Sequence, residues 1–134
     1  MERKESLAQF KISLGRLRKL VQVGKGILAE HGSTRGELEA AGVYDDLQDL
    51  ESRAGQLYRD ILPHANFLIG GDEGVEKIKK QITEAILAID FLGPLAMQEL
   101  IDELKRGWAL DAEFYPIVQL ERMLAMLEVV EQNV

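Results

Sequence analysis

The sequence contains no cysteine, which excludes disulfide bonds, thiolate zinc sites and cysteine nucleophiles. A glycine-rich phosphate loop is also missing, because residues 70–74 are acidic and no Lys-Ser or Lys-Thr pair follows them. Neither histidine has a glutamate three residues before it, as the inward-facing ligands of a di-iron bundle require. We therefore expect no metal and no cofactor.

Long hydrophobic runs are absent as well. The longest apolar stretch, residues 85–97, is interrupted by Asp90 and is shorter than the roughly 20 residues that a membrane-spanning helix needs. The polar residues 1–6 are not followed by an apolar stretch of the kind found in signal peptides. We therefore expect a cytoplasmic protein without membrane contact.

Basic residues are outnumbered by acidic ones, and the net charge is −7. This balance argues against general nucleic-acid binding, since phosphate contacts need a basic surface. The charge is unevenly distributed, however, because residues 1–30 contain seven Lys or Arg and only three Glu. This basic segment either pairs with acidic neighbours inside the fold or forms a local patch for an anionic partner.

Apolar residues recur at helical spacing along most of the chain. Over residues 7–28 they alternate in steps of three and four and form a broad stripe, which is typical of a helix in a bundle. Further helical patterns cover residues 34–61, 72–91, 94–107 and 116–127. No alternating, β-branched run predicts a strand, and the short connections favour antiparallel neighbours. The sequence predicts an all-α protein in which residues 1–134 form a single compact bundle of four to five mostly antiparallel helices.

Three local features refine this prediction. Thr34 and Glu37 form a capping-box pattern, but Ala-Ala-Gly at residues 40–42 weakens the first turns, so the firm part of this helix should begin near Val43. Gly24 falls on an apolar stripe, where a missing side chain allows a neighbouring helix to approach closely. Pro63 lacks a backbone N–H, so the helix should end or kink there.

The pattern over residues 72–91 is apolar nearly all round in its second half. A helix without a polar face is typically enclosed by other elements. We therefore expect this helix to be the most buried one.

Residues 59–64, Arg-Asp-Ile-Leu-Pro-His, are the stretch that hints at chemistry. Arg59, Asp60 and His64 resemble the signature of the HEPN family, in which an arginine and a following polar residue precede a histidine by a few positions. HEPN proteins are small and all-α, and many are RNases or partners of nucleotidyltransferases. The resemblance implies that Arg59 holds the scissile phosphate, that His64 acts as acid or base, and that Asp60 orients them, in a site formed across a dimer.

The alternative interpretation of Arg59 and His64 is structural. Arg59 then pairs with a nearby acid, and His64 binds backbone carbonyls at a helix end. RNA is an expected partner only if the protein is a HEPN-like RNase, or a toxin or antitoxin module derived from one.

Bulky or rigid residues gather between the last two helical patterns, namely Trp108, Phe114, Tyr115 and Pro116. They either cover one end of the bundle or form an exposed anchor for a partner, since aromatic residues concentrate binding energy. Met123 and Met126 lie near the apolar stripe of the last helix. Because methionine adapts to irregular surfaces, these residues are candidates for an interface between copies.

Acidic residues form a row at Asp45, Asp46 and Asp49. They are either a solvated helix face or the basis of a third hypothesis, a nucleic-acid mimic that binds a basic protein. The interpretation we favour is a non-enzymatic protein that acts through protein–protein interaction as an adaptor, complex subunit or inhibitor. Its partner is then another protein or a second copy in a homodimer.

Overall fold

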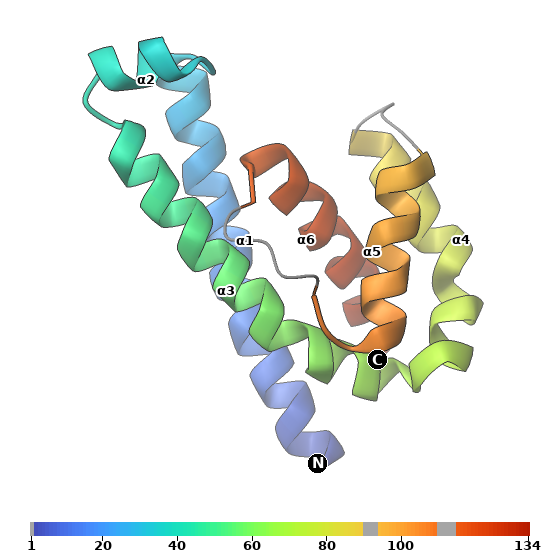
Figure 1. The fold of residues 1–134 in the computed structure, drawn as a ribbon. Coiled ribbons are helices and arrows are strands. Elements are labelled where there is room, and N and C mark those ends of the chain that lie inside the picture. The colour runs from blue at the N-terminus through green and yellow to red at the C-terminus, as the bar shows by residue number, and fades with distance from the viewer. Residues whose placement is uncertain (1, 90–93, 110–114) are drawn as a thin grey trace.

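The computed structural model describes residues 2–89, 94–109 and 115–134, which form six α-helices and no strand (Figure 1). The helices are α1 (Arg3–His31), α2 (Arg35–Ala40), α3 (Tyr44–Ile69), α4 (Gly71–Ile89), α5 (Pro94–Arg106) and α6 (Ile117–Gln132). The prediction of an all-α bundle is confirmed. The described residues contain six helices rather than four or five, because the predicted helix over residues 34–61 is divided in two.

The division between α2 and α3 has a local cause. Thr34 caps α2 by accepting a hydrogen bond from the backbone N–H of Glu37 at 3.2 Å, as the capping-box pattern predicted. Gly42 then has a φ of +75°, a left-handed conformation that ends a helix. The long helix α3 begins at Tyr44, one residue from the predicted start.

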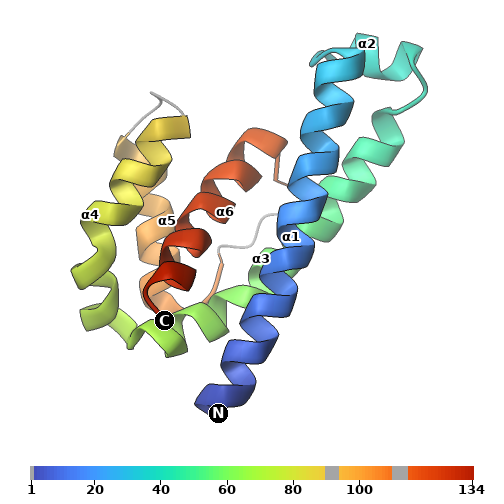
Figure 2. The ribbon, with the colours of Figure 1, turned by 180° about the vertical axis from the view of Figure 1, so that it is seen from behind.

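The helices α1 and α3 form a long antiparallel pair, and α2 crosses one end of it (Figures 1 and 2). Pro63 does not end α3, which continues to Ile69. In Figure 1 the last, yellow-green part of α3 turns away from the direction of its first part, as a proline kink predicts. The kink directs the chain toward α4 and away from α1.

The central helix is α6, which lies between the α1–α3 pair and the α4–α5 pair (Figures 1 and 2). It contacts α1, α3 and α4. Buried side chains occur on nearly all its sides, namely Ile117, Leu120, Arg122, Met123, Leu124, Met126, Leu127, Val129 and Val130. The expectation that residues 72–91 form the most buried helix was wrong. Near the end of α4, Leu87 and Ile89 are 43% and 41% exposed.

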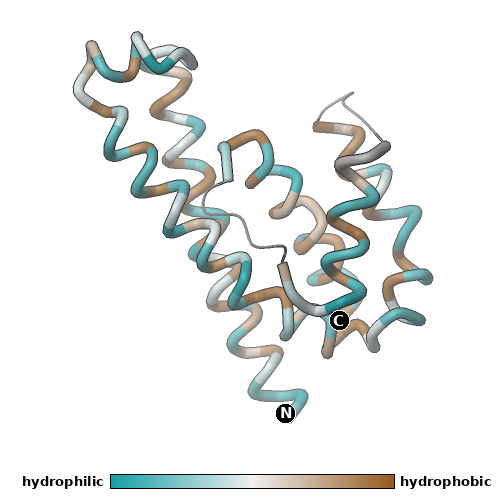
Figure 3. Tube along the Cα trace, viewed as in Figure 1, coloured by the Kyte–Doolittle hydropathy of each residue, from teal (hydrophilic) through white to brown (hydrophobic). Residues whose placement is uncertain are grey.

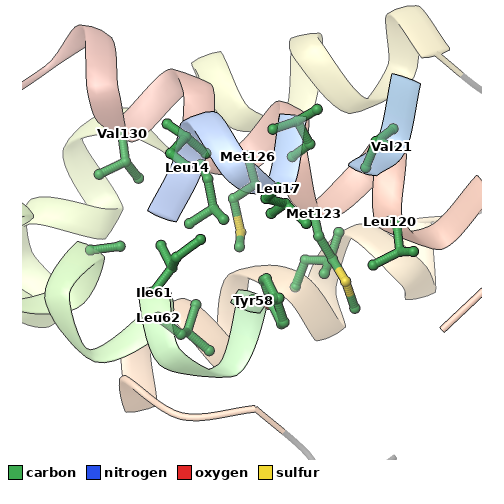
Figure 4. Packing of buried hydrophobic residues seen from close by; sticks show 14 of the residues in the cluster. Leu14, Leu17, Val21, Tyr58, Ile61, Leu62, Leu120, Met123, Met126 and Val130 are labelled. Atoms are coloured by element: carbon green, nitrogen blue, oxygen red, sulfur yellow. The ribbon is translucent and has the colours of Figure 1, made fainter. Parts of the chain in front are cut away.

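The core consists of the inner faces of these helices, and Figure 4 shows its centre. Side chains of α1, α3 and α6 meet there, including Leu17, Tyr58 and Met126. Apolar and polar positions alternate along the outer helices (Figure 3), which is typical of helices that bury one face. Gly24 of α1 is buried at the contact with α6, where an added Cβ would overlap the Ile117 side chain. The prediction of close helix approach at Gly24 is thus confirmed.

Gly55 of α3 provides a test of this packing. A Cβ at this position would lie 2.7 Å from Cδ2 of the Tyr115 ring, so Gly55→Ala should lower the free energy of unfolding by about 1 to 3 kcal/mol. Gly15 of α1 is the control, because a Cβ there meets nothing within 4 Å. Gly15→Ala should raise the free energy of unfolding by about 1 kcal/mol. Urea denaturation measures the free energy of unfolding of both variants. Equal increases in the two variants would show that no close contact exists at Gly55.

Candidate functional site

Arg59, Asp60 and His64 all lie on α3 but contact different neighbours. The Arg59 guanidinium lies over the Tyr115 ring, 5.6 Å from its centroid. Asp60 is exposed and accepts a hydrogen bond from Gln56 Nε2 at 3.2 Å. His64 Nδ1 lies 2.7 Å from Ser6 Oγ on α1. Because each helical residue advances by about 100°, Arg59 and His64 point roughly 140° apart.

Within one chain, these contacts leave Arg59 and His64 with separate neighbours. A site of the HEPN kind would need a second chain to bring an Arg59 and a His64 together. The structural alternative differs in detail, because Arg59 packs on an aromatic ring and His64 lies inside α3 rather than at its end. The hydrogen bond between Ser6 and His64 joins α3 to the first turns of α1, where Arg3 Nη1 also donates to the Leu68 carbonyl at 3.0 Å.

The predicted partner-binding residues are separated by the fold. Trp108 is 54% exposed, and the Arg106 guanidinium lies 4.8 Å from its ring centroid. Phe114 lies outside the described residues. Tyr115 is buried with its ring 6.1 Å from that of Tyr58, in an edge-to-face arrangement.

Met123 and Met126 point into the core (Figure 4), where they are 1% and 0% exposed. The physical reason is the position of α6, which packs against α1, α3 and α4 with both methionines on its inward sides. Of the five residues proposed for partner binding, Trp108 is exposed, while Tyr115, Met123 and Met126 belong to the core of this chain.

The basic residues of α1 divide into two groups. Arg18 and Lys25 face α6, where Arg18 lies 3.3 Å from Glu131 and Lys25 lies 3.3 Å from Glu121. Arg16 and Lys19 are exposed and, like Arg53 on α3, take part in no ion pair within the described residues. The expected pairing inside the fold is thus confirmed for Arg18 and Lys25, while an anionic partner for the remaining cations stays a prediction. Part of the basic segment pairs inside the fold, and the rest leaves a local positive patch.

This patch borders a groove between α1 and α3, which we call the α1–α3 groove. Its volume is about 610 Å³, and its lining consists of Arg16, Lys19, Leu20, Val23, Arg53, Gln56, Leu57 and Asp60. Leu20 and Leu57 are half-buried and form an apolar floor, while Val23 beside them is 47% exposed. Three cations therefore surround an apolar strip, with Asp60 as the acidic residue of the lining.

Exposed apolar side chains continue from the groove along α1. Ile12 is 51% exposed, and its spacing from Arg16, Lys19 and Val23 places all four on one side of the helix. The core positions of α1, such as Leu14 and Val21, occupy the opposite side. The folding of this chain therefore does not account for Ile12 and Val23.

The row Asp45, Asp46 and Asp49 is exposed near the start of α3. Asp45 and Asp46 belong to the first turn of that helix, where carboxylates interact favourably with the helix dipole. A structural role accounts for two of the three. No group of three His, Asp or Glu side chains that could hold a metal ion occurs in the described ranges.

Two buried acids escaped notice in the sequence. Glu103 on α5 is 5% exposed and accepts a hydrogen bond from the Tyr58 hydroxyl. Burial raises the pKa of Tyr58 well above its ordinary value, and the Glu103 carboxylate raises it further. This bond joins α3 to α5 within the core.

Glu51 on α3 is the second buried acid, also 5% exposed. The pKa of Glu51 is raised to about 7. Burial raises this pKa by more than the hydrogen bond from the Ile117 N–H lowers it. Ile117 is the first residue of α6, so Glu51 serves as a cap for the central helix. A signal was present in the sequence, because Glu51 stands between Leu50 and Ala54 on the apolar stripe of α3.

The contact between Ser6 and His64 can be measured by a double-mutant cycle. Because a neutral hydrogen bond contributes about 1 kcal/mol, Ser6→Ala and His64→Ala should together cost less than the sum of the two single changes, with a coupling energy of about 0.5 to 1.5 kcal/mol. Urea unfolding of the four proteins gives this value. Strictly additive losses would contradict a direct interaction between α1 and α3 here.

The raised pKa of Glu51 predicts a pH dependence of stability. Because the native state favours the protonated acid, stability from this group is full below pH 4.5, the ordinary pKa of a glutamate side chain, and is lost as pH rises through about 7. Glu51→Gln removes the charge and keeps an oxygen for the Ile117 N–H. The free energy of unfolding of this variant relative to wild type should rise by roughly 3 kcal/mol between pH 4.5 and pH 8. A constant difference over this range would contradict a buried ionisation.

No helix in the described part of the chain is long and apolar enough to cross a membrane. Comparison with family models, with curated proteins and with solved structures finds no match to this chain.

Proposed function

We propose that this protein is a non-enzymatic binding module that takes an acidic, partly apolar segment of another protein into the α1–α3 groove. The observation that carries the proposal is the group of three cations around an apolar floor, on the side of the α1–α3 pair that the core does not use. Such a surface matches a partner that offers carboxylates beside apolar side chains.

The composition of the groove favours protein over nucleic acid as the partner. Single-stranded nucleic acids bind through aromatic side chains on which the bases stack, together with cations along the backbone. Among the described residues that line the groove none is aromatic, and the floor is formed by Leu20 and Leu57. An overall charge of −7 also disfavours a long phosphate chain, which reaches beyond the local patch.

The RNase alternative depends on a second chain. Arg59 and His64 point apart on α3, and the Arg59 guanidinium lies over Tyr115. In contrast, the α1–α3 groove is complete in one chain. It needs neither a dimer nor a rearrangement of side chains to present its cations.

A peptide-display selection tests the proposal. A random peptide library is selected against wild type, against Arg16→Glu/Arg53→Glu, and against Lys77→Glu/Lys80→Glu, which makes the same change in net charge on α4. Wild type and the α4 control should enrich the same peptides, rich in Asp or Glu and in apolar residues. The groove variant should bind them about tenfold more weakly or worse, because removal of the cations leaves carboxylates facing like charge.

Salt dependence and oligomeric state complete this test. Binding should weaken as ionic strength rises, because the contacts of an exposed groove are screened. Enrichment of basic peptides, or unchanged binding by the groove variant, would refute the proposal. A wild-type dimer that Arg16→Glu/Arg53→Glu dissociates would assign the groove to a second copy instead.

A further inference from the structure

A second hollow, which we call the Glu51 cavity, lies where α1, α2 and α3 meet the start of α6. Its volume is about 320 Å³, within the range of small-ligand sites. Its lining consists of Leu28, Ser33, Arg35, Leu38, Tyr44, Leu47, Glu51, Pro116, Ile117 and Val118. Most of these side chains are apolar, and Glu51 is the acid among them.

Among the described residues, no cation forms an ion pair with the Glu51 carboxylate. Arg35, the basic residue of the lining, is engaged elsewhere, because its Nε lies 2.7 Å from Glu39 Oε1 and its guanidinium lies over the Tyr44 ring. The Ile117 N–H provides Glu51 with a hydrogen bond but with no full positive charge. A buried carboxylate without a cation is costly, and a ligand that brought one would remove that cost.

We propose that the Glu51 cavity binds a primary aliphatic amine, whose ammonium group pairs with the Glu51 carboxylate while its hydrocarbon chain lies against Leu38, Leu47 and Ile117. A free alkylamine and the side chain of a lysine share this chemistry. The site is separate from the α1–α3 groove, since it shares no residue with that lining. It therefore does not depend on the proposed function.

The alternative explanation for Glu51 is that it only caps α6. One substitution distinguishes this capping role from amine binding. Glutamine at position 51 keeps an oxygen for the Ile117 N–H but carries no charge. If Glu51 serves only as a cap, Glu51→Gln leaves amine binding unchanged. If the carboxylate holds the ammonium group, the substitution removes the preference for an amine.

The pH dependence follows from the groups that face the cavity. α2 contributes Arg35, α3 contributes Tyr44 and Glu51, and the lining residues of α1 and α6 do not titrate. Guanidinium groups and alkylamines stay protonated from about pH 5.5 to pH 8. The carboxylate is thus the group whose charge changes over this range. Amine binding should therefore strengthen with rising pH as Glu51 ionises.

The experiment is an NMR titration with n-hexylamine and n-hexanol, followed at the backbone amides of Ile117 and Val118. At pH 8 wild type should bind hexylamine at least about tenfold more tightly than hexanol, and the preference should disappear in Glu51→Gln and shrink at pH 5.5. The Arg16→Glu/Arg53→Glu protein is the control and should bind hexylamine as wild type does. A capped lysine, N-acetyl-lysine-N-methylamide, distinguishes the two sources of the amine. Tighter binding of this compound than of hexylamine would indicate a lysine side chain, and weaker binding a free alkylamine.

Three outcomes would overturn the proposal. These are equal affinity for hexylamine and hexanol, hexylamine binding that Glu51→Gln leaves unchanged, and the absence of any shift at Ile117 and Val118 with both compounds. The comparison of the two compounds in wild type needs no variant, so a folding defect cannot obscure the result.

Discussion

The enclosure of α6 is the constraint on which the rest of the structure depends. This helix is apolar on nearly all sides, so α1, α3 and α4 must all cover it. The close approach of α1 to α6 requires glycine at position 24, because a side chain there would overlap Ile117. The first N–H groups of a central helix are also removed from water, and Glu51 on α3 binds one of them. Packing and capping of α6 thus determine which residues of α1 and α3 face inward.

The same constraint divides the charges of α1 between folding and surface. Arg18 and Lys25 lie on the side that meets α6 and pair with its glutamates. Arg16 and Lys19 lie on the side that α6 cannot reach, next to exposed Val23. Both sides of α1 carry cations, but within the described residues only the cations that face α6 form ion pairs. The remaining cations are the basis for assigning the α1–α3 groove to an acidic partner.

The sequence predicts elements and faces better than it predicts neighbours. Local patterns identified the buried face of α1 and the capping box at Thr34, because each depends on residues near in sequence. The apolar stripe also placed Gly24 at a helix contact, although it did not identify Ile117 as the neighbour. Helical periodicity also assigned central burial to residues 72–91 rather than to α6, and an interface to Met123 and Met126. Periodicity shows that a face is apolar but not which helix covers it. The separation of Arg59 from His64 depends, in contrast, on α3 continuing through Pro63, where the sequence predicted an end or a kink.

Glu51 shows how a buried group can exceed what the fold requires. An uncharged glutamine would offer the Ile117 N–H the same kind of acceptor, without a carboxylate whose pKa is raised to about 7 by burial. The cost of ionising that carboxylate is roughly 3 kcal/mol, a large part of the 5 to 15 kcal/mol that typically stabilises a domain. Capping therefore explains the oxygen but not the charge. If the proposed amine binds, its ammonium group stabilises that charge, and its hydrocarbon chain contacts the apolar walls formed by Leu38 and Leu47.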